Sequence, residues 1–203
     1  NDILVYLEQK YPEPALIPSG KDEETRALLA DEDDLHLDLR AISMRYLFGP
    51  QAVRTEEQLS VYENTGAGTI GGEPDPHKAV ELKFFREMAA NNGVSDDQIV
   101  KSVGRFRNTL DTFDQRLAAH EHLLDDHLSV VDIAWYIYAV RLTHAGYPLH
   151  RLHKNLGAWF DKLNAKPEFQ REVQLPPPLV AARDALHAEQ KSQGTSLEAV
   201  AGL

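Results

Sequence analysis

The amino-acid sequence predicts an all-α protein. Apolar residues recur at helical spacing over long segments, and no run alternates as a half-buried strand does. Proline and glycine clusters separate these segments. With 203 residues and 42% hydrophobic residues, the chain is long enough to bury a substantial core. These observations together favour a bundle of helices over a mixed α/β fold.

The most apolar long segment runs from Leu128 to Leu142, and we expect it to form the helix at the centre of the core. Ser129 can accept a hydrogen bond from the backbone of Asp132, and Asp132 can accept one from Ser129, which is a capping box. Leu128 and Ile133 stand where a hydrophobic staple would form. A serine and an aspartate could also belong to a hydrolase triad. Capping explains both without catalysis, and the sequence has no nucleophile elbow.

The first part of the chain is expected to hold three helices. A helix over residues 1–11 precedes a proline-rich linker at 12–20, and a helix of about 40 Å follows over Asp22–Phe48. The buried stripe of this long helix is predicted to contain Leu28, Leu35, Leu39, Ile42 and Tyr46. The segment 51–75 is rich in Gly, Glu and Pro and is predicted to be a surface loop, with a helix over 76–91 after it.

The later part of the chain is predicted to be helical as well. Ser95 and Gln98 form a second candidate capping box, which would begin a helix extending to about Ala119. After the central helix we expect a helical turn following Pro148, a helix over 155–165, a turn from Pro167, a helix over 179–191 and a frayed tail.

Composition excludes several classes of partner. The net charge of −11 argues against nucleic acid and anionic membranes, because phosphate groups need clustered Lys and Arg. The chain has no cysteine, hence no disulfide framework, thiolate metal site or cysteine nucleophile. No signal peptide or spanning segment is evident, and a cytoplasmic location is compatible with this. Because residue 1 is Asn rather than Met, we expect that an upstream part is missing.

Several motifs together resemble a known family. Leu128-Ser-Val-Val-Asp-Ile133, Gly146-Tyr-Pro148 and the segment Asn155–Phe169 resemble the C-terminal all-α domain of cytosolic glutathione S-transferases. Residues 3–18 resemble the last helix of that family's thioredoxin-like domain and the linker after it. The resemblance extends over 1–48 and 94–173, is weaker over 49–93, and ends at about Pro176.

The resemblance implies three regions. Residues 1–20 would be the end of a thioredoxin-like domain and its linker, 21–175 the all-α domain, and 176–203 a C-terminal extension. The family's reaction is the attack of the glutathione thiolate on a small hydrophobic electrophile, a detoxifying transferase activity of cytoplasmic homodimers. Glutathione is then a co-substrate. Its site and the catalytic residue would lie upstream of residue 1, so no catalytic residue is assigned here.

The resemblance also indicates where an electrophile would bind. His36, Arg40 and Ser43 share one side of the long helix at spacings of four and three. The simplest interpretation is an exposed face with ion pairs, but in the family this helix borders the cleft between the two domains. The predicted substrate-binding residues are His36, Leu39, Arg40, Ser43, Tyr46, Trp135 and Tyr138. Two alternatives remain: a non-catalytic binding or assembly module of the same superfamily, and an unrelated helical binding domain.

Two further motifs are weaker. Gly66–Gly71 matches G-x-G-x-x-G, but that motif needs a strand before it and a helix that begins at its last glycine. Here Glu73-Pro-Asp-Pro76 follows instead, and its negative charge would repel phosphate, so we interpret the motif as a loop. The segment His120–His127 and the pair His150 and His153 contain residue types that bind zinc. They lie where polar surface residues are expected anyway, and no metal site is predicted.

Overall fold

The structure is a computed structural model that describes residues 2–65, 69–70, 73–74 and 76–203. It confirms the all-α prediction, because most of the core residues lie in helices. The strands of the described chain are β1 (Thr69–Ile70) and β2 (Glu73–Pro74), which pair antiparallel with Thr69 opposite Pro74. The helices before them are α1 (Asp2–Lys10), α2 (Asp22–Asp34), α3 (His36–Ser43) and α4 (Glu56–Asn64), and those after them are α5 (Pro76–Ala90), α6 (Asp96–Leu117), α7 (Val130–His144), α8 (Leu149–Leu152), α9 (Lys154–Asn164), α10 (Pro167–Val173), α11 (Pro177–Gln193) and α12 (Leu197–Ala201).

Helix α7 is the central helix that the sequence predicts. It packs against α2, α3, α8 and α9, and most of its side chains are buried. Ile137 is 44% exposed and, with Arg141 one turn later, marks the one side of α7 that reaches the surface. Both halves of the capping box between Ser129 and Asp132 are present. The central position of α7 therefore follows from an apolar surface that is nearly continuous around the helix.

The Asp132 carboxylate does more than cap α7. It is fully buried and accepts from the Ser129 backbone at 2.9 Å, the Ser129 hydroxyl at 2.7 Å and the Leu123 backbone at 3.0 Å. It also accepts from the Trp159 indole at 2.8 Å and lies 3.2 Å from Nδ1 of His122. The segment before α7 and the helix α9 are thus joined through one carboxylate.

The single long helix expected over residues 22–48 is interrupted twice, so that prediction was wrong in detail. At Leu35 the backbone N–H is shared between the carbonyls of Asp31 and Glu32, which tightens the turn and separates α2 from α3. After Ser43 the chain widens into a π-helical turn, η1 (Met44–Phe48), and then a 3₁₀ turn, η2 (Gly49–Ala52). Apolar spacing does not record such changes of pitch, because the buried stripe continues through them.

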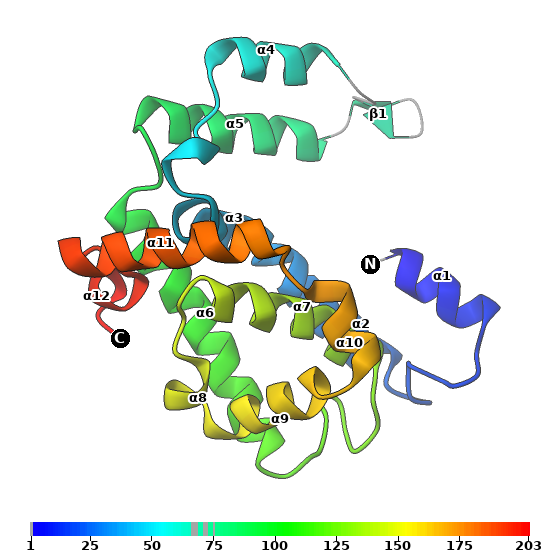
Figure 1. Ribbon diagram of the computed structural model, residues 1–203. Coiled ribbons are helices and arrows are strands. Elements are labelled where there is room, and N and C mark those ends of the chain that lie inside the picture. The colour runs from blue at the N-terminus through cyan, green and yellow to red at the C-terminus, as the bar shows by residue number, and fades with distance from the viewer. Residues whose placement is uncertain (1, 66–68, 71–72, 75) are drawn as a thin grey trace.

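The segment 51–75 was predicted to be a surface loop, and the structure corrects this. It contains α4, whose N-terminus is closed by a capping box between Thr55 and Gln58. Helix α4 packs on α5 through the fully buried Leu59. Figure 1 shows these two helices as an arm that extends away from the other helices. Gly66–Gly71, the glycine motif of the sequence, falls largely outside the described residues.

The C-terminal extension is ordered helix rather than a frayed tail. Helix α11 crosses the bundle beside η1 (Figure 1), and α12 packs on α6 through Leu197, which is 2% exposed. His187 of α11 lies 2.8 Å from the Tyr46 carbonyl, and the Gln190 amide donates to the Arg45 carbonyl at 3.1 Å. Two carbonyls of the widened turn therefore obtain their partners from α11.

Ser95 accepts a hydrogen bond from the Gln98 backbone at the start of α6, as the sequence suggests. Asp38 on α3 is nearly buried and accepts from Ser102 of α6 at 2.7 Å. Arg105 of α6 pairs with the same carboxylate. These contacts join α3 to α6 and fix the helix that carries the predicted substrate-binding residues.

The buried His153, at the start of α9, makes folding stability depend on pH. Burial lowers its pKa below the ordinary value of 6.5, although the neighbouring Asp111 carboxylate opposes the shift. Because the unfolded chain then binds a proton more readily, stability is expected to fall as pH decreases through 6.5. Urea unfolding at pH 7.5 and 5.5 should show a smaller difference for His153→Phe than for the natural chain. His127→Asn, at a side chain that is 84% exposed, should retain the full difference in stability between the two pH values. If His153→Phe loses as much stability between pH 7.5 and 5.5 as His127→Asn does, His153 is not the source of the pH dependence.

Candidate functional site

Six polar residues from three helices meet beside α3, and we call them the polar cluster. Four of them were predicted from the sequence as substrate-binding residues, and Arg141 and Glu81 were not. The members are His36, Arg40 and Ser43 of α3, Tyr138 and Arg141 of α7, and Glu81 of α5.

Hydrogen bonds connect the polar cluster from helix to helix. Arg40 lies 2.5 Å from the Glu81 carboxylate and 3.0 Å from Nε2 of His36. Nδ1 of His36 lies 3.2 Å from the Tyr138 hydroxyl. Since arginine can only donate, Nε2 of His36 accepts and Nδ1 carries the proton. The arrangement therefore requires a neutral imidazole.

The electrostatics agree with this assignment. Burial, followed by the positive charges of Arg40 and Arg141, lowers the pKa of His36. Burial, followed by the Glu32 carboxylate, raises the pKa of the Tyr138 hydroxyl, which therefore stays protonated at neutral pH. Burial of Glu81 would raise its pKa, but the hydrogen bonds from Tyr62 and Arg40 outweigh it and the net shift is downward. The polar cluster thus contains two arginine cations and an ionised Glu81.

Aromatic residues extend the polar cluster toward the arm. The Arg54 guanidinium lies 3.7 Å from the centre of the Phe85 ring, and the Arg40 guanidinium lies 5.7 Å from it. Tyr62 of α4 donates to Glu81 at 2.5 Å. A cavity of about 470 Å³ borders Phe85 and Arg54 on their outer side, next to the partly exposed Phe48. Charged and aromatic surfaces are therefore adjacent here.

Five of the seven predicted substrate-binding residues are buried, and three of these lie outside the polar cluster. Leu39 is fully buried, Tyr46 is 1% exposed and Trp135 is 2% exposed. Trp135 packs edge-on against Phe113 at 4.7 Å between ring centres and donates from its indole to the Leu28 carbonyl. Burial raises the pKa of Tyr46 to about 12. A role for these three in substrate binding stays a prediction.

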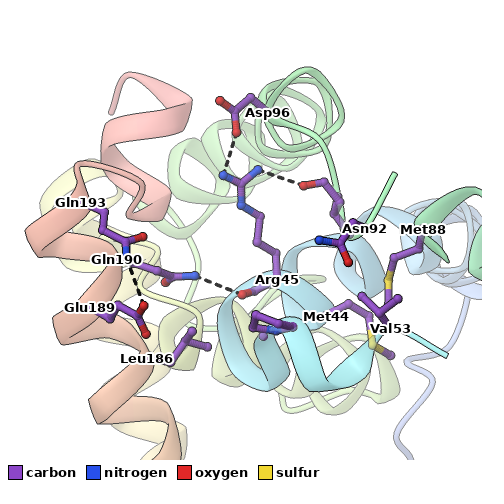
Figure 2. Close-up of a pocket in the computed structure, with 14 residues that line it drawn as sticks. Met44, Arg45, Val53, Met88, Asn92, Asp96, Leu186, Glu189, Gln190 and Gln193 are labelled. Carbon is purple, nitrogen blue, oxygen red and sulfur yellow. Dashed lines mark hydrogen bonds and ion pairs between the residues drawn. The ribbon is translucent and has the colours of Figure 1, made fainter. Parts of the chain in front are cut away.

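A separate cavity of about 340 Å³ lies between η1, α6 and α11. Figure 2 shows Arg45 reaching across it to Asp96, and the Gln190 amide on the Arg45 carbonyl. Met44, Met88 and Leu186 form its apolar surface. None of the seven predicted substrate-binding residues lines this cavity, so the polar cluster and the cavity of Figure 2 are different places on the molecule.

The histidines considered as metal ligands have other roles. His122 is buried against Asp132, and His153 stacks on Tyr147. Glu121 pairs with Lys162 at 2.6 Å, and His150 contacts Asp161 at 3.0 Å. Within the residues that the structure describes, no group of three or more His, Cys, Asp or Glu side chains is placed to hold a metal ion.

Comparison with known proteins shows a family to which part of the chain is similar. Residues 79–162 match the family model described as glutathione S-transferase, C-terminal domain. The match supports a C-terminal domain of the glutathione S-transferase type in this part of the chain. Comparison with curated proteins gives no match, and no solved structure matches either.

The polar cluster lies partly within the segment that matches the family model. Glu81, Tyr138 and Arg141 lie inside the matched segment, whereas α3 precedes it. Sequence reasoning missed Arg141, although a signal existed. Between Ile133 and Leu142 it is the one charged residue in a helix that is otherwise apolar. Glu81 gave no such signal, because its helix carries several charges.

Among the residues that the structure describes, no helix combines the length and the apolar character that a membrane span requires.

Proposed function

We propose that this chain supplies the electrophile-binding side of a glutathione transferase. The observation that carries the proposal is the polar cluster, in which His36 and Arg40 reach the surface from the helix that borders the substrate cleft in this family. The match of residues 79–162 to the glutathione S-transferase C-terminal domain supports it. Glutathione would be the co-substrate.

We further propose that residues 1–20 belong to a thioredoxin-like domain that holds glutathione. Helix α1 and the residue after it direct several apolar side chains to solvent: Ile3 is 74% exposed, Tyr6 57% and Tyr11 63%. An apolar surface of this kind is expected where another part of a domain packs. Glu8 accepts from the backbones of Leu16 and Ile17, which holds the linker against α1.

In the proposed reaction the glutathione thiol first loses its proton. The thiolate sulfur attacks an electrophilic carbon, a carbon–sulfur bond forms, and the leaving group departs with the electrons of its former bond. The residues of this chain would bind and orient the electrophile and keep water from it. Activation of the thiol is assigned to the thioredoxin-like domain.

Arg40→Ala tests the electrophile-binding role. In the protein expressed from its complete reading frame, we expect the KM for the electrophile to rise about tenfold, the effect of losing one charged hydrogen bond. The KM for glutathione should stay unchanged, because Arg40 belongs to the electrophile side. Steady-state kinetics with each substrate varied in turn measures both constants.

Lys83→Ala is the matched control, since Lys83 lies on α5 with its side chain 77% exposed. This variant should have natural kinetics. Equal changes in both KM values for Arg40→Ala, or no change in either, would count against the polar cluster as the binding site. A complete lack of glutathione-dependent turnover in the natural protein would count against the proposed function itself.

A further inference from the structure

Arg141 differs from the other arginines of the described chain. Most of them pair with a carboxylate, as Arg40 does with Glu81 and Arg45 does with Asp96. Arg26 and Arg107 are exposed. Arg54 is half-buried but lies over the ring of Phe85. Arg141 is half-buried with neither kind of partner: within the described residues, its side chain has one hydrogen bond, at 3.0 Å to the Ser43 hydroxyl.

The surroundings make this charge costly to keep. Arg141 lies close enough to Arg40 for the two positive charges to repel, and burial adds to the cost by lowering the pKa of the Arg141 guanidinium. Arginine remains charged in proteins, so the cation persists. A half-buried cation is normally paired, because its desolvation is otherwise uncompensated. Glu81 is engaged by Arg40 and Tyr62, and no carboxylate of the described residues pairs with Arg141. An anion from outside can therefore supply its counter-charge.

Ser43 holds the guanidinium in position. Its hydroxyl donates to the Leu39 carbonyl at 2.7 Å and accepts from one nitrogen of Arg141. Four of the five N–H groups of a guanidinium then have no partner in the described chain. The planar guanidinium fork matches a carboxylate, which it can bind through two parallel hydrogen bonds.

An apolar surface lies next to this charge. Ile137 precedes Arg141 by one helical turn, so both are on the same side of α7, and Ile137 is 44% exposed. We propose that the electrophile is a hydrophobic, preferably aromatic, carboxylate whose carboxyl group pairs with Arg141 and whose apolar part lies along Ile137. This inference rests on the proposed function and names the substrate class of that site.

A carboxylate fits better than a phosphate. One guanidinium of the polar cluster lacks a carboxylate partner, so a single negative charge balances it. A phosphate monoester would bring close to two negative charges near neutral pH, and the Glu32 and Glu81 carboxylates already act on the neighbouring His36. The excess negative charge would be repelled.

The test compares two aryl chlorides that differ only in charge, 4-chloro-3-nitrobenzoate and 4-chloro-3-nitrobenzamide. Glutathione sulfur replaces chloride in both, and chloride leaves with the bonding pair. With the protein from its complete reading frame, we expect a lower KM for the benzoate. Arg141→Gln should raise that KM about 10- to 100-fold, the range of a charged hydrogen bond, while both the benzamide and glutathione values stay unchanged. Arg141→Lys should restore part of the difference.

Arg107→Gln is the matched control, because it removes the same charge from the exposed surface of α6. It should leave both KM values unchanged, and circular dichroism melting should show that every variant is folded. If both compounds react but Arg141→Gln affects them equally, the carboxylate inference is overturned while the proposed function stands.

If neither compound reacts, calorimetric titration with 4-nitrobenzoate decides the inference separately from the proposed function. Binding that weakens in Arg141→Gln but not in Arg107→Gln would support a carboxylate site. Equal binding of 4-nitrobenzoate and 4-nitrobenzamide, or no binding of either, would overturn it.

Discussion

Asp132→Ala is expected to lower the free energy of unfolding by about 4 kcal/mol or more, a loss at the upper end of single substitutions. The carboxylate is fully buried and accepts from Ser129, Leu123 and Trp159. Removing it leaves several buried donors without a partner, each costing about 1–3 kcal/mol. An ordinary helix cap contributes about 1 kcal/mol, so the extra loss reports the additional donors.

Chemical denaturation at pH 7 would measure this loss. Ser95→Ala removes the serine cap of α6, which is exposed, and should cost only about 1 kcal/mol. Comparison of the two variants separates the capping contribution from the buried network. A loss for Asp132→Ala no larger than that for Ser95→Ala would show that the buried donors find other partners. If the Asp132→Ala variant keeps its stability but loses turnover, the result would instead favour a catalytic role for Asp132 over the capping role.

Trp135→Ala is expected to lower the free energy of unfolding by about 4 kcal/mol, within the usual range of 3–5 kcal/mol for removing a buried tryptophan or phenylalanine. The side chain is 2% exposed, packs against Phe113 and Tyr138, and donates to the Leu28 carbonyl. Its loss would open a large cavity where α2, α6 and α7 meet, and would remove the hydrogen bond from the indole to the Leu28 carbonyl.

Trp135→Phe is the informative companion, since it keeps an aromatic ring but loses the indole N–H. We expect about half the loss of the alanine variant. Kinetics of the folded phenylalanine variant then address the substrate-binding role. A KM for the electrophile that rises with little loss of stability would show that Trp135 reaches the substrate. Unchanged KM values would leave Trp135 as a core residue.

Much of the bundle could be predicted because its signals are local. Ser129 and Asp132 mark the start of α7 in the sequence alone, and Pro76 and Ser95 do the same for α5 and α6. The misses have physical causes. Helix α4 directly precedes a glycine-rich stretch of sequence, which favours the prediction of a loop, although Thr55 and Gln58 carry a capping box. The final helix α12 is held by burial of Leu197 against α6, a contact that no local pattern reveals.

The polar cluster could be predicted only in part for the same reason. His36, Arg40 and Ser43 share a helix face, which spacing alone indicates. Their partners come from elsewhere in the chain: Tyr138 and Arg141 lie about a hundred positions later, and Glu81 belongs to α5. Such pairings depend on how helices cross, and single-helix periodicity contains no information about that.

The contact between α11 and the widened turn η1 has a consequence for inheritance. His187 and Gln190 meet the carbonyls of Tyr46 and Arg45, which lie 141 and 145 positions earlier. Arg45 and Tyr46 lie where this helical segment ends, and carbonyls in a last helical turn lack partners within the helix, so they take them from outside. The two segments therefore constrain each other during divergence. A chimaera that exchanged only the segment containing α11 would keep the turn but lose its two partners, so we expect the two segments to be exchanged together.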